Sequence, residues 1–367
     1  MRILLLSAYG AGSHRQWRDV VSTMLPDCTF EVLELPARHF SWRVRGNALY
    51  WSMAERAVLE REYDLLLATS MVDLATLRGL VRSIANLPAI VYFHENQFAY
   101  PEQSGQQGIV EAQVTSIYSA LAADQLLFNS AYNRDSFLAG VARLLDKLPD
   151  FVPAGVPDHL SAKSDVLPVP LEPVPAIPEQ ARGSVLRVQW LGRFEYDKGP
   201  ELLSATLEAL ESTGLDYEIA ITGQQFRRGP EVFDELRSEY IARIVQFGYI
   251  ESRQDYLAQL AQAHIVLSTA RQEFQGLAVM EAVQRGAVPV VPNRLAYVET
   301  YPAACRYAVE GDDLAEASAA AERIVDTWEA LHANSATLPD LAAYEVPALE
   351  PRYRALFEAV RGRQANS

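Results

Sequence analysis

A nine-residue segment late in the chain carries the most informative chemistry. Glu273-Phe274-Gln275-Gly276-Leu277-Ala278-Val279-Met280-Glu281 places two carboxylates eight residues apart around a glycine. The apolar run 265–267 precedes it, so we expect a strand, a turn at Gly276 and a helix whose first N–H groups suit a diphosphate. Carboxylates accept hydrogen bonds from hydroxyls, and both glutamates can face one ligand. The pattern favours a sugar nucleotide; the alternative is a surface glutamate followed by an amphipathic helix.

A basic turn in the same half of the chain adds suitable charge. Gly192, Arg193 and Lys198 follow the apolar run 186–191. An arginine fork and a lysine point charge can together neutralise a diphosphate, although a solvated basic loop would look the same. Backbone groups after two later apolar runs can hold the edge of a nucleobase, and the candidates there are Gln224, Tyr249 and Ile250.

Polar residues also follow apolar runs in the first half of the chain. Gly10-Ala11-Gly12-Ser13-His14 follows the first run, where glycine permits close backbone approach and Ser13 is the expected N-cap. His94-Glu95-Asn96-Gln97 follows the fourth run and Asn129-Ser130 the fifth. An ordinary turn or helix cap remains the alternative at each place. Because ligands of parallel sheets bind beyond the carboxyl ends of strands, we expect these side chains to line a site.

A short basic strip near the N-terminus interleaves cations with aromatic side chains. Such strips grip phosphates and stack unpaired bases. The alternative is a loop folded over the first domain with its aromatic side chains buried. The strip consists of Arg38, His39, Phe40, Trp42, Arg43 and Arg45.

Short apolar runs alternate with amphipathic stretches along the whole chain, which predicts parallel sheets flanked by helices. The expected strands are 3–7, 30–35, 65–69, 89–93 and 125–128, then 186–191, 217–222, 244–247, 265–268 and 288–291. Helices are expected at 13–24, 109–123, 199–212 and 351–363. The two series predict two doubly wound Rossmann-like domains facing across a cleft.

The proline-rich stretch 151–183 shows no helical period and is interpreted as a loop and linker. We place the domain boundary near Pro178. This gives an N-terminal acceptor-side domain at 1–177, a donor domain at 178–346 and a C-terminal helix in 347–367 that packs back across the divide.

Composition narrows the function classes. A net charge of −15 argues against a simple nucleic-acid binder, and no apolar run is long enough for a transmembrane helix. Two cysteines in 367 residues indicate a reducing, cytoplasmic compartment and no zinc site. The chain contains no P-loop motif, no G-x-S-x-G and no D-x-D pair after a strand, so a P-loop ATPase, a serine hydrolase and a metal-bound phosphate site are not expected.

As a set, Gly192-Arg193…Lys198, the Glu273…Glu281 pair and the two-domain plan resemble retaining GT-B glycosyltransferases of the family 4 type. The chain resembles more specifically the tRNA-queuosine α-mannosyltransferase family. The residues that carry this likeness are Tyr9-Gly10, Gly12-Ser13-His14, Leu35–Arg43, Ala48-Leu49-Tyr50, Tyr92–Gln97, Tyr100-Pro101 and Ser268–Phe274. That family transfers mannose from GDP-mannose to the cyclopentenediol of queuosine in the anticodon of an aspartate tRNA.

The resemblance implies a role for each matching residue. Arg193 and Lys198, with the amides of 275–278, would hold the donor diphosphate, while Glu281 would bind ribose and Glu273 the mannose. His94 would contact the sugar near the reacting bond, and Gly12 would admit the acceptor beside the donor. The implied catalytic residues are His94, Arg193, Lys198 and Glu273. The donor-binding set adds Gly12, Gly192, Gln224, Tyr249, Ile250, Phe274, Gln275, Gly276, Leu277, Ala278 and Glu281. The acceptor-binding set is Ser13, His14, Arg38, Trp42, Arg43, Glu95, Asn96, Gln97 and Asn129.

Mechanistically, no metal, cofactor or dedicated enzyme nucleophile is expected; the nucleotide sugar is a cosubstrate. Three alternatives stay open for the activity. The first is transfer to a lipid, glycan or small-molecule acceptor, the second a sugar-nucleotide epimerase and the third an inactive binding module. The sequence carries no sign of an oligomeric state.

Overall fold

The computed structural model describes residues 1–99, 109–174, 184–225, 229–309 and 311–363. The chain forms two compact units, one of Met1–Glu172 with Ala342–Ser367 and the other of Pro173–Leu341. The boundary expected at Pro178 lies outside the described residues, and so does the Tyr100-Pro101 pair.

Unit 1 is built on a six-stranded sheet in the order β2-β1-β3-β4-β5-β6, with every neighbouring pair parallel. Its central strands are buried on both faces, as expected when helices cover both sides of a parallel sheet. The strands are β1 (Arg2–Gly10), β2 (Thr29–Pro36), β3 (Leu65–Thr69), β4 (Ala89–Phe93), β5 (Gln125–Phe128) and β6 (Ser164–Val166).

Helices cover both faces of this sheet, and the larger apolar core lies on the face packed by α2, α4, α5 and α6. Helix α1 lies on the other face, where the ring of Trp17 stacks on that of Tyr92 at 4.4 Å. The helices of Met1–Glu172 are α1 (Gly12–Met24), α2 (Phe40–Ala54), α3 (Arg56–Leu59), α4 (Leu74–Leu80), α5 (Ile109–Leu121), α6 (Ala131–Leu145) and α7 (Val156–Ser161), with a 3-10 turn at Arg82–Ile84.

Two expectations about unit 1 are wrong in detail. Ser13 is not the N-cap of α1, because the helix already begins at Gly12 and Ala11 holds the cap position. The stretch expected to be irregular contains α7 and β6, since Gly155 adopts a left-handed conformation that starts a helix despite Pro157.

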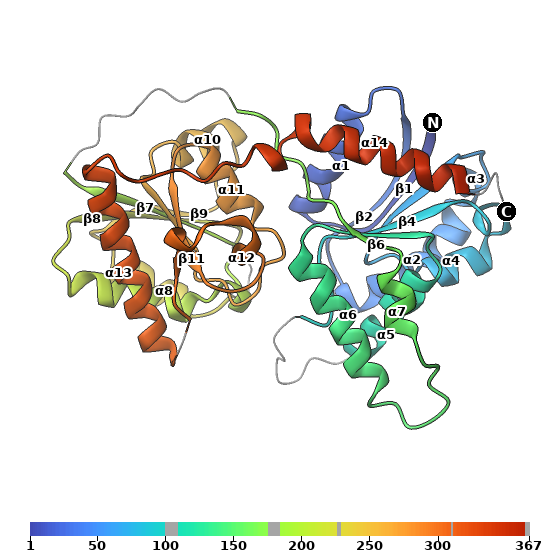
Figure 1. Ribbon diagram of the computed structural model, residues 1–367, viewed down its shortest axis with the longest axis horizontal. Helices are drawn as coiled ribbons and strands as arrows, with labels where there is room; N and C mark the ends of the chain where they lie inside the picture. The colour runs from blue at the N-terminus through green and yellow to red at the C-terminus, as the bar shows by residue number, and fades with distance from the viewer. Residues whose placement is uncertain (100–108, 175–183, 226–228, 310, 364–367) are drawn as a thin grey trace. The chain divides into compact units, whose positions relative to one another are not determined.

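The C-terminal helix α14 (Val346–Arg363) belongs to unit 1 and lies beside α1 (Figure 1). The Tyr353 hydroxyl accepts a hydrogen bond from Trp17 Nε1 at 3.0 Å and donates to the Pro168 carbonyl at 2.9 Å. The helix begins five residues earlier than expected, with Pro347 in its first turn and Pro351 inside it. It therefore completes a core begun by the N-terminal residues.

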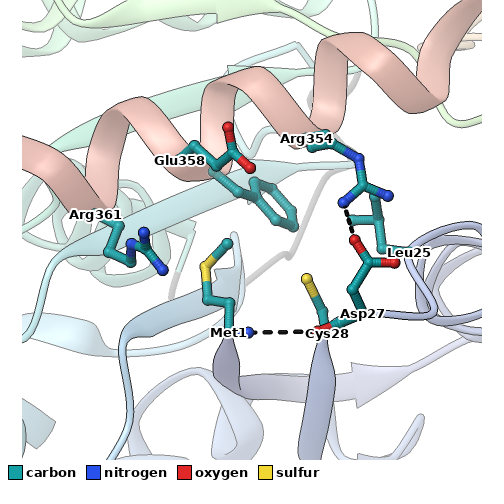
Figure 2. A pocket seen from close by; sticks show the side chains of 8 residues that line it. Met1, Leu25, Asp27, Cys28, Arg354, Glu358 and Arg361 are labelled. Carbon is teal, nitrogen blue, oxygen red and sulfur yellow. Dashed lines mark hydrogen bonds and ion pairs between the residues drawn. The ribbon is translucent and has the colours of Figure 1, made fainter.

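Beneath α14 a cavity of about 90 Å³ opens at the amino ends of β1 and β2 (Figure 2). Arg354 forms an ion pair with Asp27 beside this cavity, and the fully buried Phe357 is one of the residues that line it. Burial raises the pKa of the Cys28 thiol, so this cysteine stays protonated at neutral pH. This edge of the sheet is the one opposite the carboxyl ends of the strands.

Unit 2 repeats the plan with the order β12-β11-β10-β7-β8-β9, again with parallel pairs. Helices α8, α9 and α13 build the core on one face, and α11 packs against β10 and β11. The strands are β7 (Leu186–Leu191), β8 (Tyr217–Thr222), β9 (Ile244–Gly248), β10 (Ile265–Leu267), β11 (Val288–Pro292) and β12 (Arg306–Tyr307). The helices are α8 (Pro200–Glu211), α9 (Val232–Glu239), α10 (Arg253–Leu260), α11 (Leu277–Gln284), α12 (Tyr297–Thr300) and α13 (Asp313–His332), with 3-10 turns at Tyr196–Lys198, Ala303–Cys305 and, in unit 1, Ala342–Tyr344.

The structure confirms the two Rossmann-like units with all ten expected strands, to within one to three residues at each end. The two strands missed, β6 and β12, are three and two residues long. No helix among the described residues is long and apolar enough to cross a membrane.

Candidate functional site

Strand order marks one place in each sheet where a ligand is expected. In unit 2 the chain runs from β7 outward through β8 and β9, then returns to place β10 on the other side of β7. The loops after β7 and β10 diverge at such a switch point and leave a crevice between them. These two loops hold Gly192–Lys198 and Ser268–Gly276, the two segments singled out from sequence.

The structure joins these loops through Lys198. Its Nζ lies 3.2 Å from Glu273 Oε2, 3.4 Å from Asp197 Oδ2 and 3.1 Å from the Gln272 carbonyl oxygen. Burial alone would lower the pKa of Lys198, but the two carboxylates outweigh it and raise that pKa. The ammonium is therefore charged and held at the start of the turn that leads into α11.

Glu273 has two kinds of partner. Besides Lys198, its Oε1 accepts hydrogen bonds from the backbone N–H of Phe274 at 3.0 Å and of Gln275 at 3.4 Å. Burial alone would raise the pKa of Glu273, but Lys198 and the backbone N–H groups of Gly276 and Gln275 lower it. The N–H of Gln275, which is expected to serve a diphosphate, contacts the Glu273 carboxylate here, whereas Leu277 and Ala278 begin the helix; the role of these amides stays a prediction.

Gly276 is required by geometry at this turn. Its φ is +79°, and a Cβ there would come within 2.8 Å of the Tyr297 ring. A left-handed residue directly before α11 lets the chain enter the helix at once, so that the helix N-terminus faces the loop of Lys198.

A buried carboxylate stabilises the loop after β10. Glu316 on α13 is 5% exposed and pairs with Arg294 at 2.6 Å and with Arg271 at 2.9 Å. Arg294 also donates two hydrogen bonds to the carbonyl of Ala270, at 3.1 and 3.2 Å. Glu316 therefore fixes the backbone that leads into Glu273, and sequence reasoning missed it because α13 is distant in the chain.

The second glutamate of the segment has a cation of its own. Glu281 Oε1 lies 2.5 Å from Arg253 Nη2, and Oε2 lies 3.2 Å from Arg253 Nη1. The Tyr256 hydroxyl donates to Oε2 at 3.1 Å. Neither α10 residue was expected from sequence, although their spacing of three residues places both on one helix face.

The remaining donor candidates lie around these loops. Arg193 is 45% exposed and pairs with Glu195 at 2.9 Å and Asp197 at 3.6 Å. Asp197 thus contacts both expected cations, a role that sequence reasoning did not assign although it directly precedes Lys198. Gln224 and Tyr249 are exposed and Ile250 half-buried at the ends of β8 and β9, whereas Phe274 is buried.

In unit 1 the switch point lies between β1 and β3. Gly12, Ser13 and His14 follow β1, and Gly12 and Ser13 are exposed. The residues after β3 were missed: Thr69 and Ser70 are buried there, and Oγ1 of Thr69 and Oγ of Ser70 find no hydrogen-bond partner among the described residues. In the sequence, only the position of these two residues at the end of an apolar run could have indicated a role in a site.

His94 is enclosed by rings at the end of β4. Its imidazole stacks on that of His14 at 4.2 Å and lies 4.9 Å from Trp17 and 4.7 Å from Tyr92. The side chain is 6% exposed, and Nε2 has no hydrogen-bond partner among the described residues. Burial, with His14 beside it, holds the pKa of His94 well below its ordinary value, so the imidazole is neutral at pH 7.

Two expected acceptor residues instead support this histidine. Asn129 donates to the His94 carbonyl at 2.9 Å, and Asn133 donates to Asn129 Oδ1 at 2.8 Å. Asn96 is 1% exposed and bonds Asn133 and the backbone N–H of Phe98. Asn96 and Asn129 thus help to hold the loop after β4, and their acceptor assignments stay predictions; Glu95 and Gln97 beside them are half-buried.

The basic strip is not a buried loop. It enters α2, where Trp42 is 57% exposed and Phe40 meets the ring of Tyr9 edge-on at 6.1 Å. A Cβ at Gly46 would collide with the Trp42 ring, so the indole lies over this glycine. Arg38 is exposed and Arg43 half-buried, whereas Arg45 pairs with Asp73 at 2.6 Å. The alternative that both aromatic side chains are buried is wrong for Trp42.

A family model described as the N-terminal region of tRNA-queuosine alpha-mannosyltransferase matches residues 2–171, and one described as a family 4 glycosyltransferase in conflict systems matches residues 155–295. A Drosophila melanogaster protein described as tRNA-queuosine alpha-mannosyltransferase is 36% identical over 310 residues, covering 82% of this chain and 81% of the relative. The chain belongs to the tRNA-queuosine alpha-mannosyltransferase family. The expected glycosyltransferase class is thereby confirmed.

Solved glycosyltransferase structures share the fold of this family member at low sequence identity. Anabaena HepE in complex with UDP and glucose has a TM-score of 0.67 at 14% identity, covering 98% of this chain and 100% of that one. Sucrose-phosphate synthase from Thermosynechococcus elongatus has a TM-score of 0.64, also at 14% identity, with coverage of 98% and 100%. The expected GT-B class is confirmed. The individual site residues stay predictions.

Glu316→Gln should lower the free energy of unfolding by about 3 kcal/mol, because it removes a buried charge that pairs with both Arg271 and Arg294. Asp313→Asn is the matched control: Asp313 pairs with the same Arg271 but is 66% exposed, so its loss should cost less than about 1 kcal/mol. Urea unfolding followed by circular dichroism measures both. Equal losses in the two variants would show that Glu316 does not brace the loop.

His94 should make the protein sensitive to mild acid. Its pKa in the folded chain lies well below 6.5, so the unfolded chain binds the proton more readily. The stabilisation is complete above about pH 6.5 and is lost as the pH falls toward the folded pKa. Urea unfolding between about pH 7 and pH 5 should therefore show a steeper loss for wild type than for His94→Gln.

The exposed His159 provides the control for this titration, and His159→Gln should keep the wild-type pH dependence. If His94→Gln loses stability with pH as steeply as the wild type, burial of a neutral His94 is not the cause.

Proposed function

We propose that this protein transfers mannose from GDP-mannose to the cyclopentenediol of queuosine in the anticodon of an aspartate tRNA, with retention at the anomeric carbon. The match over 310 residues to a relative described as a tRNA-queuosine alpha-mannosyltransferase carries the proposal. The paired Lys198 and Glu273 beside the unit 2 switch point support it, because they bring a cation and a hydroxyl acceptor to one place.

On the donor side, Lys198 and Arg193 neutralise the diphosphate together with the first amides of α11. Glu273 has one position left on Oε2, beside Lys198, for a hydrogen bond from a mannose hydroxyl, and its lowered pKa keeps it an acceptor at neutral pH. Glu281 takes the ribose hydroxyls. Because Lys198 and Arg193 provide the positive charge, the proposal needs no divalent metal.

The transfer forms a bond between an acceptor oxygen and the anomeric carbon, while the bond from that carbon to the diphosphate breaks. The hydroxyl proton passes to the leaving diphosphate on the same face. Charge grows on the diphosphate as the sugar becomes oxocarbenium-like, and one preorganised donor at such a point contributes about 3–4 kcal/mol. Neutral His94 donates or accepts one hydrogen bond near the sugar and carries no charge.

On the acceptor side, Trp42 offers a flat exposed ring and Arg38 an exposed cation, which suit an unpaired base and a phosphate. Although the chain as a whole carries a charge of −15, this strip is locally basic. The proposal places the protein in the cytoplasm, where tRNA is modified.

The proposed reaction can be tested directly by incubating the protein with GDP-mannose and queuosine-containing tRNA. Nucleoside mass spectrometry should detect queuosine carrying one added hexose, and EDTA should leave the rate unchanged. Lys198→Ala should lower kcat by about 100-fold to 1,000-fold, the effect of losing one preorganised charge partner. Lys147→Ala removes the same charge from an exposed site and should keep the wild-type rate.

Absence of added hexose with every sugar nucleotide tried would refute the tRNA acceptor. Transfer to a lipid, glycan or small molecule instead would keep the enzyme class and replace the acceptor. A covalent sugar adduct on Glu273 or Glu95, trapped with a fluorinated donor, would contradict transfer without an enzyme nucleophile.

Trp42→Ala should weaken tRNA binding by about 5-fold to 150-fold, since stacking of one base contributes roughly 1–3 kcal/mol. Gly46→Ala keeps the Trp42 indole but displaces it from its position over residue 46, so this variant should weaken tRNA binding similarly. Filter binding at two salt concentrations measures the effect. Tyr118→Ala, which removes an equally exposed aromatic ring from α5, serves as control. Unchanged affinity in both test variants would exclude stacking on Trp42.

A further inference from the structure

The carboxylate proposed to receive the donor ribose is already engaged. Arg253 reaches both oxygens of Glu281, at 2.5 and 3.2 Å, and the Tyr256 hydroxyl takes a third position at 3.1 Å. The Glu281 side chain is only 9% exposed. A carboxylate has about four lone-pair positions, so a ribose diol, which needs two, cannot be added to these three contacts. One partner must leave when a nucleotide binds.

The partner that leaves is Arg253. Its side chain is 55% exposed, so its guanidinium can move into water or to another acceptor without leaving a buried cation behind. Tyr256, by contrast, is held among its neighbours, and burial and Glu281 raise the pKa of its hydroxyl so that it remains a donor. Tyr256 therefore keeps the carboxylate oriented while the guanidinium moves.

The nucleotide itself indicates where the guanidinium goes. Diphosphate, ribose and base follow one another along the molecule. With the diphosphate at the first turn of α11 and the ribose one turn further at Glu281, the base comes next to α10, the other element that contacts Glu281. Arg253 is the first residue of α10, and its guanidinium lies 5.2 Å over the Tyr256 ring. The planar group is thus already at the position where a base would lie.

We propose that Arg253 exchanges partners when the donor binds: it releases Glu281 to the ribose and takes the edge of the nucleobase, which makes it the residue that selects the base. A guanidinium binds best to two neighbouring acceptors, and the O6 and N7 atoms of guanine provide them. Uracil presents a single carbonyl acceptor on the comparable edge. The exchange rests on the proposed function, since it assumes that Glu281 binds the ribose, and it extends that function to the choice between nucleotides.

Nucleotide binding tests this exchange without any transfer reaction. Isothermal titration calorimetry with GDP and with UDP gives dissociation constants for the wild type, Arg253→Gln and Arg253→Lys. Arg253→Gln should raise the Kd of GDP by about tenfold and change that of UDP less, so the preference for GDP falls. The Kd of GDP for Arg253→Lys should lie between those of the wild type and Arg253→Gln, because an ammonium cannot form the two-pronged contact.

Arg237→Gln is the matched control. It removes the same charge from an exposed arginine of the same unit, on α9, and should leave both dissociation constants unchanged. Circular dichroism checks that each variant is folded.

Two results would overturn the role of Arg253. If Arg253→Gln tightens GDP and UDP alike, the arginine only competes for Glu281. If it changes both by the same factor or not at all, the base is chosen elsewhere. Failure of the proposed donor looks different, because the wild type itself would then show no preference for GDP over UDP.

Discussion

The architecture of the loop after β10 depends on one buried carboxylate. Glu316 draws Arg271 and Arg294 together beneath the carboxyl edge of the unit 2 sheet, and Arg294 in turn holds the carbonyl of Ala270. The backbone from Ala270 to Glu273 is thereby fixed before Lys198 closes on it. A loop placed in this way can present a charged pair without reorganising when a ligand arrives, which is the condition for electrostatic catalysis.

Much of the fold could be predicted from the sequence because the strands of parallel sheets have a recognisable sequence pattern. Strands buried on both faces appear as continuous apolar runs, and all ten such runs became strands. The polar motifs after β7 and β10 could be located for the same reason: the residues that follow a strand lie at its carboxyl edge. Glu273 and Lys198 were expected at one site from this rule alone, and they are 3.2 Å apart.

The partners of those motifs could not be found in this way. Glu316, Arg253 and Tyr256 lie on helices whose own patterns describe only packing, and which carboxylate they reach is decided by tertiary contacts. Asn96 and Asn129 show the converse. Their polarity suggested ligand contacts, yet buried amides must satisfy both donor and acceptor, and both are joined through Asn133, which accepts a hydrogen bond from Asn96 and donates one to Asn129. Polarity at a strand end therefore does not separate a ligand contact from a brace.

The return of α14 to unit 1 has a consequence for synthesis of the protein. Trp17 and Tyr92 are made early, but the hydroxyl that bonds Trp17 belongs to Tyr353, more than three hundred residues later. Unit 2 is an insertion within unit 1, and it can fold on the ribosome while one face of the first sheet is covered by α1 but not yet by α14. The apolar surface that α14 covers stays exposed until this last helix emerges. The N-terminal half is therefore open to aggregation and to chaperones for most of translation.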